Sequence, residues 1–231
     1  MKYPKKFIKE LTKTYYKKKV LVTGHTGFKG SWLTLWLNHL GANVMGVSID
    51  HPTKPSHYKL LNLEKKIKSK KIDVRNFKLF KNAINKFKPD FIFHLAAQSM
   101  VKKSYTKTIE TWETNLMGTL NLLELLKSNK KKKIITVIIT SDKCYKNVET
   151  KKGYKESDKL AGEDPYGASK SAAEIAFNSY VKSFFNKKIN KNLIVTARAG
   201  NVIGGGDWTE DRLIPDCIKS CIKSRRTIIR N

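Results

Sequence analysis

The sequence predicts an α/β protein with a doubly wound parallel sheet, and three observations support this fold class. Short Val- and Ile-rich runs alternate along the chain with segments whose apolar residues recur at helical spacing. The apolar runs lack the polar alternation of half-exposed strands, so we expect helices on both faces of the sheet. A glycine-rich turn joins the first apolar run to the first helical segment.

Each expected element follows from its local pattern. Strands are expected at 19–24, 43–50, 71–73, 90–97, 133–141 and 192–200. Helices are expected at 28–41, 76–87, 108–128 and 165–185. Gly41 is a helix stop, and Pro165 suits a first helical turn. Residues 1–17 form a basic, solvated lead-in that can fold as a short amphipathic helix, and residues 18–231 form one large domain.

Composition narrows the class of protein. The 231 residues are 40% hydrophobic, as in soluble globular proteins, and no apolar run reaches the roughly 18 residues of a membrane span. The N-terminus lacks the apolar stretch of a secretory signal. Cys144, Cys217 and Cys221 have neither CxxC spacing nor a histidine cluster beside them. We therefore expect a cytoplasmic protein with reduced thiols, no metal and no membrane partner.

The net charge of +28 raises the alternative of a nucleic-acid binder. The excess is nearly all lysine and is spread along the chain, with one tight cluster at 130–133. Specific nucleic-acid sites favour arginine forks and interleaved aromatic residues. We therefore expect no nucleic-acid partner, and keep this class as an alternative to test.

The turn between the first strand and the first helix has the pattern G-x-x-G-x-x-G. A diphosphate at a helix N-terminus needs backbone N–H groups at close range, which a Cβ atom would obstruct. The last glycine lets the helix pack closely on the strand. Cofactor contacts are expected from Gly24, Thr26, Gly27, Phe28 and Gly30.

Asp50 ends the second strand, about twenty residues after the glycine turn. A carboxylate there can accept both ribose hydroxyls and would repel a 2′-phosphate, which favours NAD over NADP. The positive charge of Lys54 nearby would instead favour NADP. As an alternative to cofactor binding, Asp50 could be a turn residue before His51-Pro52.

Further cofactor contacts are expected at two other strand ends. Asp73 and the Val74 N–H follow the third strand, where they can read the adenine edge. The small residues of Leu95-Ala96-Ala97 let a cofactor lie over the sheet. We interpret His94 as a packed core histidine. Asn115 either bridges strands near the site or satisfies a backbone group.

Tyr166 and Lys170 stand four residues apart at the start of a helix, so they share one face. A lysine ammonium near a phenol lowers the phenol pKa and can also hold a nicotinamide ribose. Tyr166 is therefore a candidate base for a sugar hydroxyl, and both residues are candidate cofactor contacts.

Six segments together reach a known family: KVLVTGHTGFKGSWL, HLAAQSMVKKSY, TNLMGTLNLLE, TSDKCY, EDPYGASKSAAE, and ARAGNVIGGGDW with DRLIPD. From about Lys18 to its last residue, the chain resembles the extended short-chain dehydrogenase/reductases that act on nucleotide sugars. Within them it is most similar to the CDP-glucose 4,6-dehydratases. The resemblance implies a Rossmann domain, bound NAD and a nucleotide-sugar substrate, with CDP-glucose favoured.

The resemblance also implies roles for Ser141, Asp142 and Lys143. In these dehydratases the segment after the fifth strand carries a hydroxyl, an Asp and a third proton-handling residue, which is Lys in CDP-glucose enzymes and Glu in dTDP-glucose enzymes. Tyr166 would take the C4 hydroxyl proton, with Ser141 sharing the contact to that oxygen, while hydride leaves for NAD⁺. Lys143 would then remove the C5 proton, Asp142 would protonate the leaving C6 hydroxyl, and hydride would return to C6.

This chemistry requires a neutral Lys143 and a protonated Asp142, and an ion pair between them would oppose both states. A solvated strand end is the alternative reading of these residues. Substrate contacts implied by the family are Asn201, Gln98 and Ser99, with Arg212 near the diphosphate or on a solvated helix face. Val202 would face the cofactor through its backbone.

Family members continue for about another hundred residues, so we expect most of the C-terminal substrate lobe to be missing, with its start from about residue 201. Relatives pair through their long helices, which implies a homodimer. Three alternatives stay open. They are another sugar-nucleotide dehydratase or 4-epimerase, a catalytically incomplete NAD-binding fragment, and the nucleic-acid binder above. Epimerases lack an Asp-Lys pair placed for C5 and C6 chemistry.

Overall fold

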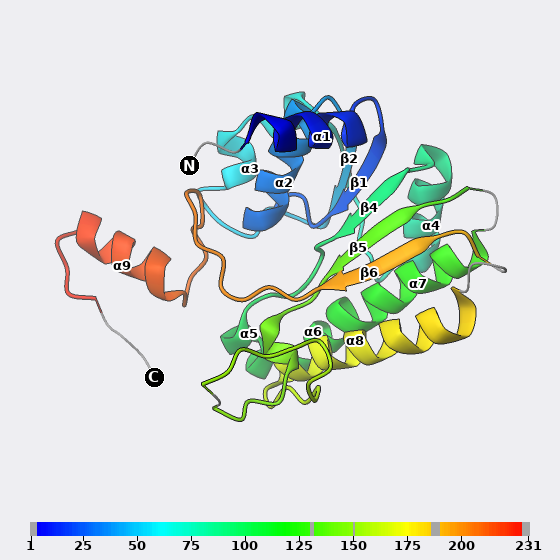
Figure 1. The fold of residues 1–231 in the computed structure, drawn as a ribbon. Coiled ribbons are helices and arrows are strands. Elements are labelled where there is room, and N and C mark those ends of the chain that lie inside the picture. The colour runs from blue at the N-terminus through cyan, green and yellow to red at the C-terminus, as the bar shows by residue number, and fades with distance from the viewer. Residues whose placement is uncertain (1–3, 130–131, 150, 186–189, 228–231) are drawn as a thin grey trace.

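The computed structural model describes residues 4–129, 132–149, 151–185 and 190–227. Its centre is one sheet of six parallel strands in the order β3-β2-β1-β4-β5-β6 (Figure 1). The strands are β1 Lys19–Thr23, β2 Asn43–Ser48, β3 Lys68–Lys71, β4 Phe91–His94, β5 Ile135–Ile139 and β6 Leu193–Ala197. The order reverses between β1 and β4, which confirms the doubly wound class.

Helices flank the sheet in two groups (Figure 1). The first group and the end of the chain contain α1 Lys5–Tyr15, α2 Phe28–His39, α3 His57–Leu60 and α9 Leu213–Ile222. The second group contains α4 Phe77–Phe87, α5 Val101–Thr106, α6 Thr108–Trp112, α7 Gly118–Ser128 and α8 Pro165–Phe184. Helix α2 lies on one face of the sheet and α4, α7 and α8 lie on the other. Among the described helices, none is long and apolar enough to cross a bilayer.

The third strand is the least accurate of the sequence predictions. We expected it at 71–73, but β3 covers Lys68–Lys71, and all four residues are exposed. The backbone of this stretch pairs with Met45–Ser48 of β2. Lysines on an exposed edge strand discourage pairing with other chains, so an edge strand needs no apolar residues and leaves no hydrophobic pattern to detect.

The helix expected at 108–128 is continuous but contains a π-helical turn, Glu113–Met117, between α6 and α7. This turn places Asn115 in the interior, where its amide bonds the backbone of Gln98 through both its oxygen and its nitrogen, at 2.9 and 3.1 Å. The side chain thus ties the segment after β4 to the helix that follows it.

The two faces of the sheet are covered unequally. Strands β1 and β2 are buried apart from their end residues, as expected for a parallel sheet. In β6, by contrast, Leu193 and Val195 are 43% and 52% exposed. The register places them beside half-buried Ile135 and Val137 of β5, on the face shared with α2. The expectation that helices cover both faces is therefore wrong for this half of the sheet.

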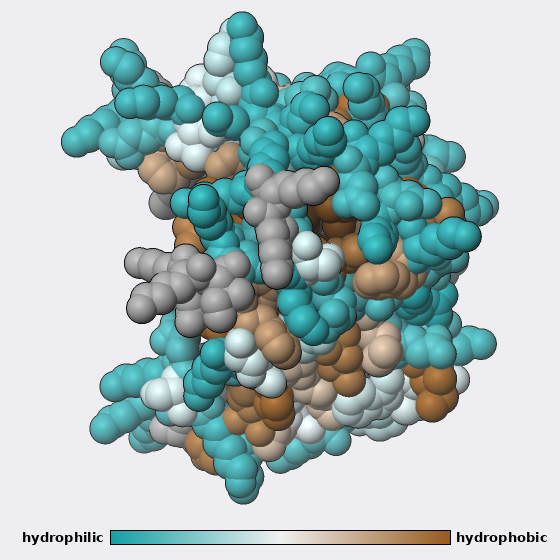
Figure 2. All heavy atoms as spheres, turned by 90° about the vertical axis from the view of Figure 1, so that its right-hand side faces the viewer, coloured by the Kyte–Doolittle hydropathy of each residue, from teal (hydrophilic) through white to brown (hydrophobic). Residues whose placement is uncertain are grey.

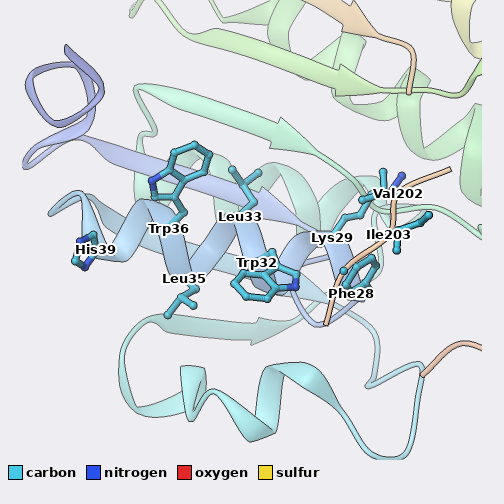
Figure 3. A pocket seen from close by; sticks show the side chains of 10 residues that line it. Phe28, Lys29, Trp32, Leu33, Leu35, Trp36, His39, Val202 and Ile203 are labelled. Carbon is cyan, nitrogen blue, oxygen red and sulfur yellow. The ribbon is translucent and has the colours of Figure 1, made fainter. Parts of the chain in front are cut away.

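An apolar groove runs along α2 (Figure 3). It has a volume of about 700 Å³ and includes Trp32, Leu33 and Trp36, with Val202 and Ile203 at one end. A different face, seen from the right-hand side of Figure 1, is mostly hydrophilic (Figure 2). This fits a chain with 47 Lys and Arg against 19 Asp and Glu.

Candidate active site

One cleft at the carboxyl ends of the strands brings most of the predicted catalytic and substrate residues together. Its volume is about 400 Å³. Its lining includes Lys29, Ser99, Ser141, Asp142, Lys143, Tyr166, Asn201, Val202 and Arg212. These residues come from five regions of the sequence, and the doubly wound topology collects them because parallel strands end at one edge. Tyr166 and the Asp142-Lys143 pair therefore face a common space.

The glycine turn lies beside this cleft and is tightly packed. Gly24 has a φ of +69°, and a Cβ atom there would lie 2.9 Å from the Ala96 nitrogen. A Cβ atom on Gly30 would lie 2.1 Å from the Gly24 oxygen. Both positions thus require glycine. Gly27 is the N-cap of α2 and supplies no side-chain cap, which leaves that helix end open to a ligand.

The turn is held against the end of β2. The Thr26 hydroxyl makes hydrogen bonds of 2.7 Å with the Ser48 hydroxyl and 2.5 Å with the Asp50 carbonyl oxygen. Asp50 is exposed at this end of the sheet. Phe28, predicted as a cofactor contact, lines the α2 groove instead of the cleft.

The residues after β3 and β4 have their own partners. Arg75 donates to both carboxylate oxygens of Asp73, at 2.7 to 3.1 Å. Burial would raise the pKa of Asp73, but the hydrogen bonds from Arg75 outweigh it and hold that pKa below its ordinary value. Val74 is buried against Gly118. The amides of Leu95 and Ala96 donate to the Thr23 hydroxyl, at 3.1 and 3.0 Å.

Tyr166 lies in the first turn of α8, which Asp164 caps by accepting from the amides of Tyr166 and Gly167. Burial raises the pKa of the Tyr166 phenol, and a hydrogen bond with Ser141 opposes this rise in pKa. We expected Lys170 to lower that pKa. Among the charges around the phenol, Arg212 lowers its pKa. The effect of Lys170 on that pKa stays a prediction.

Lys170 is buried one turn further along α8. Its ammonium donates to the Ile139 carbonyl oxygen at 3.3 Å. Burial, helped by the positive charge of Lys29, lowers the pKa of Lys170 to about 8. The hydrogen bond to Ile139 directs the ammonium of Lys170 at the end of β5.

The segment after β5 forms a short 3-10 turn, Asp142–Cys144. The Ser141 hydroxyl donates to an Asp142 carboxylate oxygen at 3.0 Å and accepts from the Lys143 amide at 3.3 Å. Asp142 and Lys143 are exposed toward the cleft. Within the described residues no ion pair joins the two side chains, so the arrangement that would oppose their predicted roles is not formed.

Gln98 does not lie where we predicted it. We expected it in the sugar pocket, but it is buried beside Asn115. Its side-chain amide donates to the Met100 carbonyl oxygen and the Thr111 hydroxyl, and its side-chain oxygen accepts from the Met100 amide. It shapes the chain that leads to Ser99, which does line the cleft. His94 is a packed core histidine, as expected, 2.9 Å from the Thr23 hydroxyl.

The far wall of the cleft comes from the segment after β6. Asn201 and Val202 are exposed there, and Arg212 is half-buried and paired with Asp207 at 3.2 Å. The alternative of a fully solvated helix residue therefore does not describe Arg212. In the described part of the chain, no three His, Cys, Asp or Glu side chains gather as metal ligands.

Sequence reasoning missed three residues that shape the site. Glu174 and Arg198 form a buried ion pair of 2.8 Å behind the Asp142–Cys144 turn. Lys29 lines the cleft from within the glycine motif. Glu174 is four residues after Lys170, so it shares that helix face, which is a usable signal. Lys29 has no comparable signal, because lysines are abundant throughout the chain. Arg198 belongs to the ARAGN motif, but the motif does not show that its partner is Glu174.

Comparison with known proteins identifies the family of the chain. The family model described as GDP-mannose 4,6 dehydratase matches residues 21–202. CDP-glucose 4,6-dehydratase from Salmonella typhimurium is 48% identical over 217 residues, which is 93% of this chain and 60% of that protein. The chain thus spans less than two thirds of the length of this relative.

Two solved structures show the same fold. An epimerase from Methanothermobacter thermautotrophicus has a TM-score of 0.82 at 25% identity, covering 97% of this chain and 64% of the other. The dTDP-glucose 4,6-dehydratase from Bacillus anthracis, solved in complex with NAD, has a TM-score of 0.74 at 23% identity, covering 91% and 63%.

Proposed function

Since the chain belongs to the GDP-mannose 4,6 dehydratase family, we propose that it catalyses NAD-dependent dehydration of a nucleotide sugar. The substrate we favour is CDP-glucose, and the product is CDP-4-keto-6-deoxyglucose. The observation that carries the proposal is the shared cleft of Tyr166, Asp142 and Lys143 beside the glycine turn. Lys143 stands where the resemblance places Lys in CDP-glucose enzymes, and the 48% identical Salmonella relative carries that name.

The residues around the glycine turn fit a dinucleotide. A Cβ atom on Gly24 or Gly30 would collide with backbone atoms, so the turn keeps the close approach of strand and helix that such sites use. The open N-terminus of α2 can hold a diphosphate, and exposed Asp50 at the end of β2 can hold ribose hydroxyls. Bound NAD would supply the acceptor, and later the donor, of hydride.

In the first proton transfer, Tyr166 would accept the C4 hydroxyl proton while Ser141 donates a hydrogen bond to the same oxygen. Burial opposes an ionised phenol, as the raised pKa of Tyr166 shows. Positive charge has to compensate, and Arg212 already acts in that direction. Lys170 would hold the ribose next to this phenol.

In the elimination, Lys143 would remove the C5 proton and Asp142 would protonate the departing C6 hydroxyl. These roles need an uncharged amine and a protonated carboxyl, which loss of water around both groups would favour. Both side chains are exposed in this structure. The sugar that fills the cleft would therefore have to provide much of the desolvation.

The test is an incubation of the protein with NAD and either CDP-glucose or dTDP-glucose, followed by detection of the 4-keto-6-deoxy product. We expect product from CDP-glucose. Product from dTDP-glucose alone would contradict the assignment of the nucleotide. A 4-epimer without loss of water would contradict the dehydratase itself.

We also propose an assembly and a location for the protein. The protein would form a homodimer through α5 to α8, where Tyr105, Ile109, Met117 and Ile175 are 48–71% exposed. It would act in the reducing cytoplasm, since Cys144, Cys217 and Cys221 are free thiols.

A further inference from the structure

Lys29 is the second residue of α2 and lies where the glycine turn meets the cleft. It lines both the cleft and the apolar groove along α2, beside Val202 (Figure 3). The side chain is half-buried. Within the described part of the chain, its ammonium makes no hydrogen bond and no ion pair.

Such an arrangement costs free energy, because a charge removed from water needs a partner. Two carboxylates lie close enough to attract Lys29, those of Asp142 and Asp207. The first accepts the Ser141 hydroxyl and the second is paired with Arg212. Both are therefore engaged elsewhere.

The surrounding charge is positive. The side chains that line the cleft carry four positive charges, on Lys29, Lys102, Lys143 and Arg212, against three negative charges, on Asp142, Glu210 and Asp211. Burial, followed by the charge of Arg212, lowers the pKa of Lys29. Lys29 in turn lowers the pKa of Lys170. An incoming anion would relieve both the burial and the mutual repulsion of these cations.

The N-terminus of α2, next to Lys29, also favours an anion. The Gly27 N-cap supplies no side-chain acceptor, and the first hydrogen bond of α2 runs from the Ser31 amide to the Gly27 oxygen. The N-terminus of a helix of this length, Phe28–His39, favours negative charge. Lys29 adds a full positive charge at that end.

We propose that the Lys29 ammonium binds the diphosphate of a nucleotide ligand at the N-terminus of α2. This inference rests on the proposed function for the nature of the ligand. A diphosphate could come from NAD or from the nucleotide sugar. The dinucleotide is the source we expect, because Lys29 belongs to the glycine turn itself.

Helix α4 provides a matched control. It also begins with Phe-Lys, but Lys78 is exposed and the helix is already capped by the Asn76 side chain. Lys29→Met and Lys78→Met remove the same charge from the second residue of two helices of similar length. Lys29→Arg keeps the charge, and Lys29→Gln is a second neutral variant in case the Met variant does not fold.

Titration calorimetry with NAD, ADP-ribose and CDP measures the effect. We expect Lys29→Met and Lys29→Gln to bind NAD and ADP-ribose about tenfold to a hundredfold more weakly than wild type, the usual cost of a lost charged hydrogen bond. Lys29→Arg should recover part of the loss, and Lys78→Met should bind as wild type does. A loss confined to CDP would support the site and assign the diphosphate to the sugar nucleotide.

Unchanged binding of all three probes would overturn the inference, and so would an equal loss in Lys78→Met. If wild-type protein binds none of them, the proposed function fails, and inorganic pyrophosphate then tests Lys29 separately. Weaker pyrophosphate binding by Lys29→Met than by wild type would still support the site, and equal binding would overturn it.

Discussion

The Arg198 guanidinium lies 2.8 Å from a carboxylate oxygen of Glu174, and the two side chains are only 11% and 1% exposed. The Thr140 hydroxyl donates to the other Glu174 oxygen at 2.5 Å, and Arg198 donates to the Tyr145 hydroxyl at 2.8 Å. This one ion pair therefore holds both ends of the turn at residues 142–144 and connects them to α8, which carries Tyr166.

Breaking this pair should be costly. Glu174→Gln leaves the Arg198 charge buried without compensation, which typically destabilises a protein by about 3–5 kcal/mol. Urea unfolding measures the change. The control is Glu110→Gln, which removes a partly exposed pair of 3.4 Å with Lys103 and should cost about 0–1 kcal/mol. Similar costs for the two variants would show that the buried pair contributes nothing special.

Acid should destabilise the protein through His94. The Thr23 hydroxyl accepts two backbone amides, so its own proton points to Nδ1 of His94, and burial lowers the pKa of His94 to about 3. Below the ordinary pKa of about 6.5, the unfolded chain binds a proton that the folded chain does not. Stability should thus fall as pH decreases from about 6.5 toward 3.

The size of this loss is of the order of a few kcal/mol, since one pKa unit corresponds to about 1.4 kcal/mol. Urea unfolding at several pH values measures it. His94→Gln should reduce the slope over this range but not remove it, because burial also lowers the pKa of His25, to about 4, and that of His57. His39→Gln, at an exposed position on α2, should retain the wild-type slope. An unchanged slope in His94→Gln would locate the pH dependence elsewhere.

Tyr166→Phe should reduce turnover of CDP-glucose by about a hundredfold to ten-thousandfold, the usual contribution of a general base. Binding of NAD should change little, because the ring remains. Product formation and NAD affinity are measured side by side. Tyr105→Phe is the control, since this tyrosine is exposed on α5. Equal activity of the two variants would exclude Tyr166 as the base.

Lys143→Ala should separate the two halves of the proposed reaction. Oxidation at C4 does not need this amine, so bound NADH should still form, while exchange of the C5 hydrogen with solvent deuterium should fall at least about a hundredfold. Absorbance and NMR follow the two steps. Lys146→Ala, an exposed lysine three residues on, is the control. Exchange at the wild-type rate in Lys143→Ala would refute its role.

Ile109→Lys should convert the proposed dimer to a monomer. The isoleucine is 71% exposed on α6, and a charge in a paired apolar surface would be buried without a partner. Sedimentation velocity gives the mass. Leu60→Lys, at a 61% exposed site on α3, should leave the mass unchanged. A wild-type monomer, or a dimer that survives Ile109→Lys, would contradict the interface.

Much of the fold was predictable, because parallel strands and amphipathic helices leave strong apolar patterns. Strands β1, β2, β4, β5 and β6 lie inside their expected ranges. The lysine-rich β3 has no such pattern, and its pairing is set by the backbone of β2. The exposed face of β6 was also missed, since an apolar run looks the same whether one or both faces of the strand are covered.

For the candidate site, too, the sequence could identify residues but could not place every side chain. Tyr166 and Asp142-Lys143 were identifiable because each belongs to a distinctive local motif. Gln98 belongs to a motif as well, yet neighbouring groups on α6 and at Met100 take up its side chain. A motif identifies a residue but does not show which way its side chain turns.

The amino-acid order alone is sufficient to predict an α/β domain, a nucleotide turn and a group of proton-handling residues, because these depend on neighbours a few positions apart. Lys29 meets Asp142 and Arg212 from a segment more than a hundred residues away. The clamp behind the cleft joins Glu174 and Arg198, which are 24 residues apart but belong to different elements. Long-range packing and the burial of charge place such groups, and neither leaves a local pattern to read.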